Sequence, residues 1–273
     1  RDGKIADPIL FVAEYLDART VYKISGAQGV AALAYGTSSV GQVDKIVGPG
    51  NAYTQAAKRL LFGTVGIDSL AGPSEIAIVA DDSAPARYVA ADLLSQAEHG
   101  SGQEAAVAFC TSYQKAEEIS AEVVALIGAH HLDQAVAQAL LSYGNLFVVD
   151  DLDTALAAVN TMAPEHLELM CQDAEMMLPA VVNAGAVFIG PYSTEPVGDY
   201  YCGTNHVLPT GGTARFASGL AVMDFMRGFS VVRYTRQALD VHGESIRRLA
   251  QAEGLRAHML AVEVRGQEDA ATQ

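Results

Sequence analysis

The sequence predicts an α/β fold made of parallel βα units and ending in a helical tail. Three observations lead to this prediction. Short apolar runs alternate with helix-length segments up to about residue 190. A Gly-rich turn follows each of the first two runs, at residues 26–29 and 48–50. Strand signals then fade after Leu220. Strands separated by helices of this length pack in parallel.

The first two predicted units each join a strand to a turn and a helix. A strand over residues 21–25 leads into the turn at 26–29 and a helix that reaches about Tyr35. A second strand over residues 43–47 repeats the unit. Neither strand is followed by GxGxxG, so the ordinary dinucleotide-binding fingerprint is absent.

The turn after the second strand is the most specific local signal. Gly48 and Gly50 accept unusual backbone angles and Pro49 fixes its own φ, which together favour a tight turn. Asn51 is a favourable N-cap for a helix that runs to about Phe62. The N–H groups of such a helix start can bind an anion or a nucleotide.

The alternation continues through the middle of the chain. Asp82 or Ser83 is predicted to cap a helix that has Pro85 in its first turn and runs to Glu98. The segment 191–212 is predicted to be a long polar loop, which is usually functional. Further strands are predicted over 76–80, 105–110, 146–149 and 187–190, and further helices over 113–127, 132–141, 152–161, 240–253 and 255–263.

Composition excludes several classes of function. The 273 residues are 50% hydrophobic and 18% charged, which is typical of a globular protein. The net charge of −15 repels a phosphate backbone, so we expect no nucleic-acid partner. No apolar run approaches the ~18 residues of a membrane span, so we expect no membrane partner. Three sparse cysteines do not form a disulfide framework, which favours a cytoplasmic protein.

Two short motifs contain residues suited to catalysis or metal binding. Gln96 and His99 in SQAEHG are three residues apart, which places both on one face of a predicted helix end. Spacing alone favours an ordinary polar helix terminus, because Gln is an uncommon zinc ligand. Glu165 and His166 in APEHLEL follow Pro164, which breaks the preceding helix. Without further information, this pair is a surface Glu beside a half-buried His.

The segments VDKIVGPGN and GTVGIDSLAGPSE strongly resemble the histidinol dehydrogenase family, and the resemblance continues to about Val264. It implies incomplete Rossmann-like domains and a helical tail exchanged between subunits. We assign a cofactor-side domain to residues 1–74, a zinc and catalytic domain to 75–219 and a dimerisation tail to 220–273. The chain begins inside the family's pattern, so we expect it to lack the family's N-terminal part, including a Tyr that contacts NAD, and to be a poor catalyst alone.

The resemblance assigns a zinc site to residues from three regions of the chain. The family's ligands match Gln96 and His99, together with Asp199 in EPVGDY and His258 in LRAH. It also makes the Glu165–His166 pair catalytic, with His166 taking the substrate's hydroxyl proton and Glu165 activating water. The substrate-binding positions implied by the resemblance are Ser74, Gln96, His99, His166, Asp199, His206, Glu253 and His258.

The implied reaction is oxidation of L-histidinol to L-histidine through L-histidinaldehyde, with NAD as oxidant and zinc as metal. Gln28 and Asn51 match family residues that contact NAD. The implied assembly is a homodimer whose active sites are shared across the interface. Two alternatives remain open: a related zinc/NAD dehydrogenase for another hydroxy compound, such as a sulfonated diol, and a catalytically incomplete fragment.

Cys202 offers a different route, since aldehyde oxidation often proceeds through a thiolate adduct. Its acidic surroundings in the sequence are expected to raise the pKa of the thiol, which disfavours this role. We therefore interpret Cys202 as a small residue that fills a tight turn.

Overall fold

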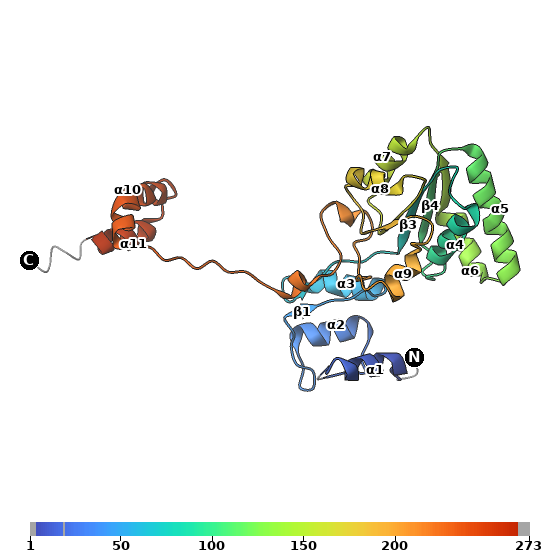
Figure 1. Cartoon of the computed structure of the whole chain (residues 1–273). Coiled ribbons are helices and arrows are strands. Elements are labelled where there is room, and N and C mark those ends of the chain that lie inside the picture. Colours follow the sequence, from blue (N-terminus) through green and yellow to red (C-terminus); the bar gives the residue numbers. More distant parts are fainter. Residues whose placement is uncertain (1–3, 19, 267–273) are drawn as a thin grey trace, which may run out of the picture. The chain divides into compact units, whose positions relative to one another are not determined.

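The computed structural model describes residues 4–18 and 20–266, and divides into two compact units, Arg1–Phe225 and Met226–Gln273. The main feature of the first unit is a five-stranded parallel sheet of order β5-β4-β3-β6-β7 (Figure 1). Its strands are β3 (Glu75–Ala80), β4 (Ala105–Cys110), β5 (Gly144–Val148), β6 (His166–Met170) and β7 (Ala186–Ile189). The α/β prediction is therefore confirmed.

Helices cover both faces of this sheet, which explains why its central strands are almost entirely apolar. Ile76 and Ile78 of β3 pack in one buried cluster with α4 (Ala86–Ala97), α5 (Tyr113–His130) and α6 (Gln134–Tyr143). The alternate residues Ala77 and Val79 pack on the opposite face. That face is covered by α7 (Leu152–Met162) and α8 (Ala174–Met177).

A smaller sheet precedes the main one in the sequence. Its two parallel strands are β1 (Lys45–Ile46) and β2 (Gly66–Ile67). Helices α2 (Gly26–Tyr35) and α3 (Ala52–Leu61) belong to the same region as these strands. Their apolar side chains form a third buried cluster. Asn51 caps α3 as predicted, since its side chain accepts a hydrogen bond from the Thr54 N–H. The preceding α1 (Asp7–Tyr15) buries none of its residues.

Several predictions of elements were wrong. Residues 21–25 form no strand, because none of the described strands pairs with them and Val21, Tyr22 and Ile24 are exposed. The strand β6 was missed. Helix α4 is preceded by Pro85 as its N-cap rather than by Asp82 or Ser83.

The predicted loop over 191–212 contains helix α9 (Glu195–Tyr200), which has Pro196 in its first turn. Pro is common in the first turn of a helix because it has no backbone N–H, and a backbone N–H there would lack a partner within the helix. Three short 3₁₀ segments also occur among the described residues, at Leu178–Ala180, Thr213–Arg215 and Val222–Phe225.

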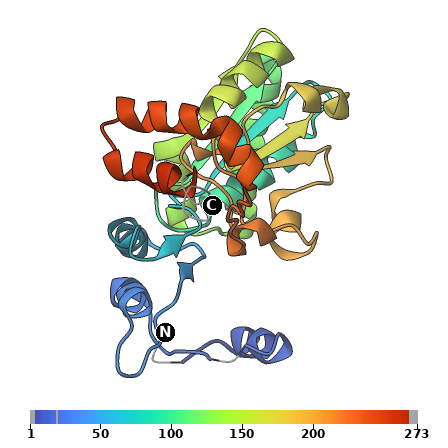
Figure 2. The same ribbon diagram turned by 90° about the vertical axis from the view of Figure 1, so that its left-hand side faces the viewer.

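The second unit consists of α10 (Arg236–Ala252) and α11 (Arg256–Gly266), which lie side by side (Figure 2). Gly243 of α10 faces Val262 so closely that a Cβ there would lie 3.2 Å from the Val262 side chain. Gly254 has a φ of 74° and ends α10 after Glu253, as the sequence predicted. No described helix has both the length and the apolar character needed to cross a bilayer.

Candidate active site

Most of the predicted site residues of the first unit gather at the amino ends of β3 and β6. Ile76 pairs with His166 in the parallel ladder, so Ser74 and Glu165 immediately precede the two paired strand ends. Helix α4 runs back across the sheet and brings Gln96 to the same end. Open α/β sheets usually bind ligands at the carboxyl ends of their strands. The candidate site here is at the opposite end.

Glu165 and His166 are both buried, with 6% and 3% of their surfaces exposed. Glu165 Oε2 accepts a hydrogen bond from the Glu75 N–H at 3.2 Å, and its carboxylate also bonds to the Ser74 side chain. His166 Nδ1 lies 3.1 Å from Gln96 Oε1 and 3.9 Å from Glu165 Oε2. Gln96 and Ser74 thus contact the acid–base pair directly.

Burial shifts the two acid–base groups in opposite directions. It raises the pKa of Glu165 to about 8, and the nearby Glu75 and Asp199 carboxylates add to the rise. It lowers the pKa of His166 to about 4, although the nearby Asp199 carboxylate opposes this shift. Burial disfavours the charged form of each group, which is the carboxylate of Glu165 and the imidazolium of His166. The pKa of the first therefore rises and the pKa of the second falls. At neutral pH the imidazole is therefore uncharged and Glu165 is protonated in most molecules.

The raised pKa of Glu165 predicts that stability falls as pH rises. The folded state holds the Glu165 proton up to a pKa of about 8, whereas the unfolded state loses it near 4.5. Between those values the folded state binds more protons, so its stability decreases with pH. Glu165→Gln removes this ionisation and should raise the free energy of unfolding by roughly 1–3 kcal/mol at about pH 9.

Urea unfolding of both proteins at about pH 5 and about pH 9 measures this effect. The difference between Glu165→Gln and the original protein should be much larger at the higher pH. An equal difference at the two pH values would contradict a buried, proton-retaining Glu165.

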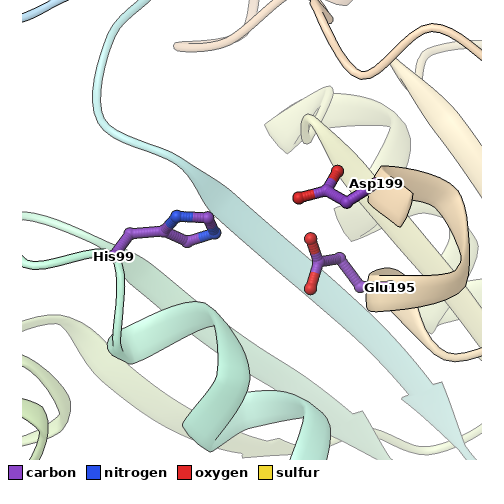
Figure 3. A group of neighbouring side chains, drawn as sticks. All are labelled: His99, Glu195 and Asp199. Atoms are coloured by element: carbon purple, nitrogen blue, oxygen red, sulfur yellow. The ribbon is translucent and has the colours of Figure 1, made fainter. Parts of the chain in front are cut away.

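A second cluster lies beside this pair and consists of His99, Glu195 and Asp199 (Figure 3). One potential ligand atom from each of the three lies within 4.8 Å of the others. The imidazole of His99 points from the segment after α4 toward the two carboxylates of α9. A cavity of about 220 Å³ opens here, lined by Ser95, Glu98, His99, Glu195, Pro196, Asp199 and Tyr200.

This arrangement corrects one expectation about the site. Gln96 and His99 do not share a helix face, because α4 ends at Ala97. Gln96 is fully buried whereas His99 is exposed. Glu195 was not predicted as a site residue. The available signal was EPVGDY, where a Pro favours a helix start and Glu195 precedes Asp199 by one helical turn.

The remaining predicted residues are distributed more widely. His206 joins the cluster, with its Nδ1 3.7 Å from Asp199 Oδ1. Gln28 and Asn51 are exposed and belong to the smaller βα region, Gln28 within α2 and Asn51 capping α3. Glu253 and His258 belong to the second unit, so their contribution to the site stays a prediction.

Cys202 is exposed and lies in the turn that ends α9, where its N–H donates to the Val197 carbonyl at 2.9 Å. A hydrogen bond with Thr204 lowers the pKa of the Cys202 thiol, in contrast to the rise expected from its acidic neighbours in the sequence. Its Sγ lies 3.0 Å from Thr204 Oγ1. The thiol has no described contact with Glu165 or His166.

Comparison with known proteins identifies the family. The family model described as histidinol dehydrogenase matches residues 1–266. The histidinol dehydrogenase of Halalkalibacterium halodurans is 48% identical over 265 residues, which cover 97% of this chain and 62% of that protein. The Bacillus subtilis histidinol dehydrogenase is 46% identical with the same two coverages.

A solved structure agrees with these sequence matches. The crystal structure of histidinol dehydrogenase from Elizabethkingia anophelis superposes with a TM-score of 0.87 at 37% identity, covering 95% of this chain and 60% of that one. The chain thus spans about 62% of the length of the curated relatives it matches. By its matched residues and its fold, the chain belongs to the histidinol dehydrogenase family.

Proposed function

We propose that the protein oxidises L-histidinol to L-histidine through L-histidinaldehyde, using NAD and zinc. This proposal rests on one observation, which is that two groups of side chains lie beside each other. A buried acid–base pair, Glu165 and His166, lies beside a cluster of His99, Glu195 and Asp199. The substrate and the cofactors are proposed from membership of the histidinol dehydrogenase family.

The cluster has the chemical character that a zinc ion requires. Imidazole nitrogen and carboxylate oxygen are preferred zinc ligands. Oε1 of Glu195 is buried and receives no hydrogen bond from a described donor. Burial and the adjacent Asp199 carboxylate raise the pKa of Glu195 to about 7. A cation near these two carboxylates would relieve their repulsion.

We assign Gln96, His99 and Asp199 of this unit, with His258, as the zinc ligands, following the resemblance of their motifs to the family. Bound zinc would supply a Lewis acid to hold the substrate, and NAD would accept its hydride. Gln28 and Asn51 are assigned to the NAD site on the same basis. Ser74, His206 and Glu253 complete the proposed substrate contacts.

His166 is suited to accept the proton of the substrate hydroxyl. Its Nδ1–H donates to Gln96 Oε1, which fixes the tautomer and leaves Nε2 as the acceptor. The lowered pKa keeps the ring neutral before the reaction. Gln96 Oε1 has a second lone pair, so bonding to His166 does not exhaust its capacity as a ligand.

Glu165 is suited to activate the water that attacks the aldehyde. Its raised pKa makes its carboxylate a stronger base than an exposed one. The Glu75 N–H and the Ser74 side chain hold the carboxylate in place. Division of the two proton transfers between adjacent residues explains why one site can perform two successive oxidations.

We also propose a cytoplasmic homodimer, in which Glu253 and His258 of one copy complete the site of the other. A reducing compartment suits the three thiols, none of which forms a disulfide among the described residues. Location of Glu253 and His258 outside the first unit is compatible with exchange of the helical tail.

Following NADH formation with L-histidinol tests the function. In a full-length homologue we expect two NADH per histidinol, loss of activity on zinc removal by a chelator, and recovery on adding zinc. Asp199→Asn, which keeps the size of the side chain but removes its charge, should weaken zinc binding by about 10-fold or more. A zinc-free active protein would refute the metal assignment. Turnover of a sulfonated diol but not of histidinol would refute the substrate assignment.

A further inference from the structure

Helix α9, which carries Glu195 and Asp199, has too few residues to be stable by itself. It contains six residues, whereas isolated helices shorter than ~12 residues are marginal in water. Its N-cap residue, Thr194, makes no capping hydrogen bond with its side chain. Other parts of the fold must therefore hold this helix in place.

Two buried carboxyl groups from other elements bind the start of α9. Thr194 Oγ1 donates to Asp92 Oδ1 at 2.5 Å, and the Glu195 N–H donates to Glu168 Oε1 at 3.0 Å. Asp92 and Glu168 are only 6% and 1% exposed. Glu168 thus satisfies a helix N–H that a capping side chain would otherwise bind.

The two carboxyl groups also contact each other, and burial together with the Asp92 carboxylate raises the pKa of Glu168. Oε2 of Glu168 is buried and accepts no hydrogen bond from a described donor. Asp92 lies one turn before Gln96 on α4, and Glu168 lies two residues after His166 on β6. The pair consequently connects the three elements that carry Gln96, His166 and Asp199.

We propose that Glu168 and Asp92 are positioning residues that hold α9 so that Asp199 and Glu195 face His99. Neither of them belongs to the proposed ligand or acid–base set. The inference rests on the proposed function only in treating Asp199 as a zinc ligand. The hydrogen bonds to α9 are independent of that role.

Two substitutions of Glu168 separate hydrogen bonding from bulk. In Glu168→Gln, the amide oxygen can accept from the Glu195 N–H while the amide NH₂ donates to Asp92, so both contacts survive. In Glu168→Leu, both are lost at similar size. We expect zinc affinity, measured by chelator competition on the full chain, to fall by about 10- to 100-fold in Glu168→Leu and to stay within about threefold in Glu168→Gln.

Hydrogen exchange of backbone amides supplies a readout that needs no metal. The α9 amides should exchange faster in Glu168→Leu than in Glu168→Gln, while the β3 amides remain protected in both. Asp81→Leu is the matched control. It removes a carboxylate that accepts the Gln172 N–H beyond the carboxyl end of β3, far along the strand from the site. It should leave α9 exchange and zinc affinity unchanged.

Each result decides the inference. The inference is overturned if Glu168→Leu has the same zinc affinity and the same α9 amide exchange as the original protein. It is also overturned if Glu168→Leu and Glu168→Gln lose zinc affinity to the same extent. If the original chain binds no zinc, the proposed function fails, but α9 exchange still decides the positioning role. If Glu168→Leu does not fold, Thr194→Val and Thr194→Ser replace the pair. In Thr194→Val the α9 amides should exchange faster than in the original protein, and in Thr194→Ser they should exchange at the original rate. Failure of either expectation would overturn the inference.

Discussion

In a full-length homologue, His166→Ala should lower the rates of both histidinol and histidinaldehyde oxidation by ~10² to 10⁴, the usual contribution of a positioned acid–base group. The physical reason is the burial of His166, which leaves 3% of it exposed, and its hydrogen bond to Gln96. Together they hold one neutral tautomer ready to accept a proton. Glu165→Gln should produce a comparable loss in aldehyde oxidation and a much smaller loss in alcohol oxidation.

The decisive assay supplies histidinol and histidinaldehyde separately and measures the first NADH from each. Zinc content and urea unfolding of each variant control for damage to the fold. Equal losses on the two substrates for Glu165→Gln would refute the division of work between the adjacent residues.

Lys58→Met should destabilise the protein by about 3–5 kcal/mol, because it leaves the buried Asp68 carboxylate without its partner. Lys58 Nζ lies 2.5 Å from Asp68 Oδ1, and the two side chains are 1% and 4% exposed. The pair also fixes the turn before α3: Nζ donates to the Gly48 carbonyl at 2.9 Å, and the Gly48 N–H donates to Asp68 Oδ2 at 2.7 Å.

Arg87→Met is the matched control, since Arg87 pairs with Glu122 at 3.1 Å while 58% of its side chain is exposed. Exposed pairs contribute ~0–1 kcal/mol, so this variant should unfold close to the original urea midpoint. Adding Asp68→Asn to Lys58→Met should recover part of the lost stability by removing the unpaired charge. Similar midpoints for the two Met variants would show that the Lys58–Asp68 pair contributes little.

Local cues in the sequence predicted much of the fold. The apolar run over 105–110 coincides with β4, and Asn51 caps α3 as expected. These features depend on a few neighbouring residues, so they can be inferred without knowing what packs around them. Residues 21–25 have a similar apolar character but form no strand, because a strand also needs a neighbour to complete its hydrogen bonds.

Strand β6 shows the opposite error. The sequence prediction ended a helix before Pro164 and assigned no strand to HLELM. Every residue of β6 is buried in the structure. Glu168 tolerates burial because Asp92 and the Glu195 N–H supply hydrogen-bond partners, and both come from distant parts of the sequence.

The sequence by itself determined the family, the α/β class and the candidate acid–base pair, because these depend on residue identities and short-range order. Only the tertiary structure brought Glu195 beside His99 and Asp199, and only burial separated the pKa values of Glu165 and His166 to about 8 and about 4. A pKa shift reflects the loss of water and the approach of other charges. Water is excluded and charges approach one another where α4, β6 and α9 meet. These three elements come from separate parts of the sequence, so no local segment reveals the shifts.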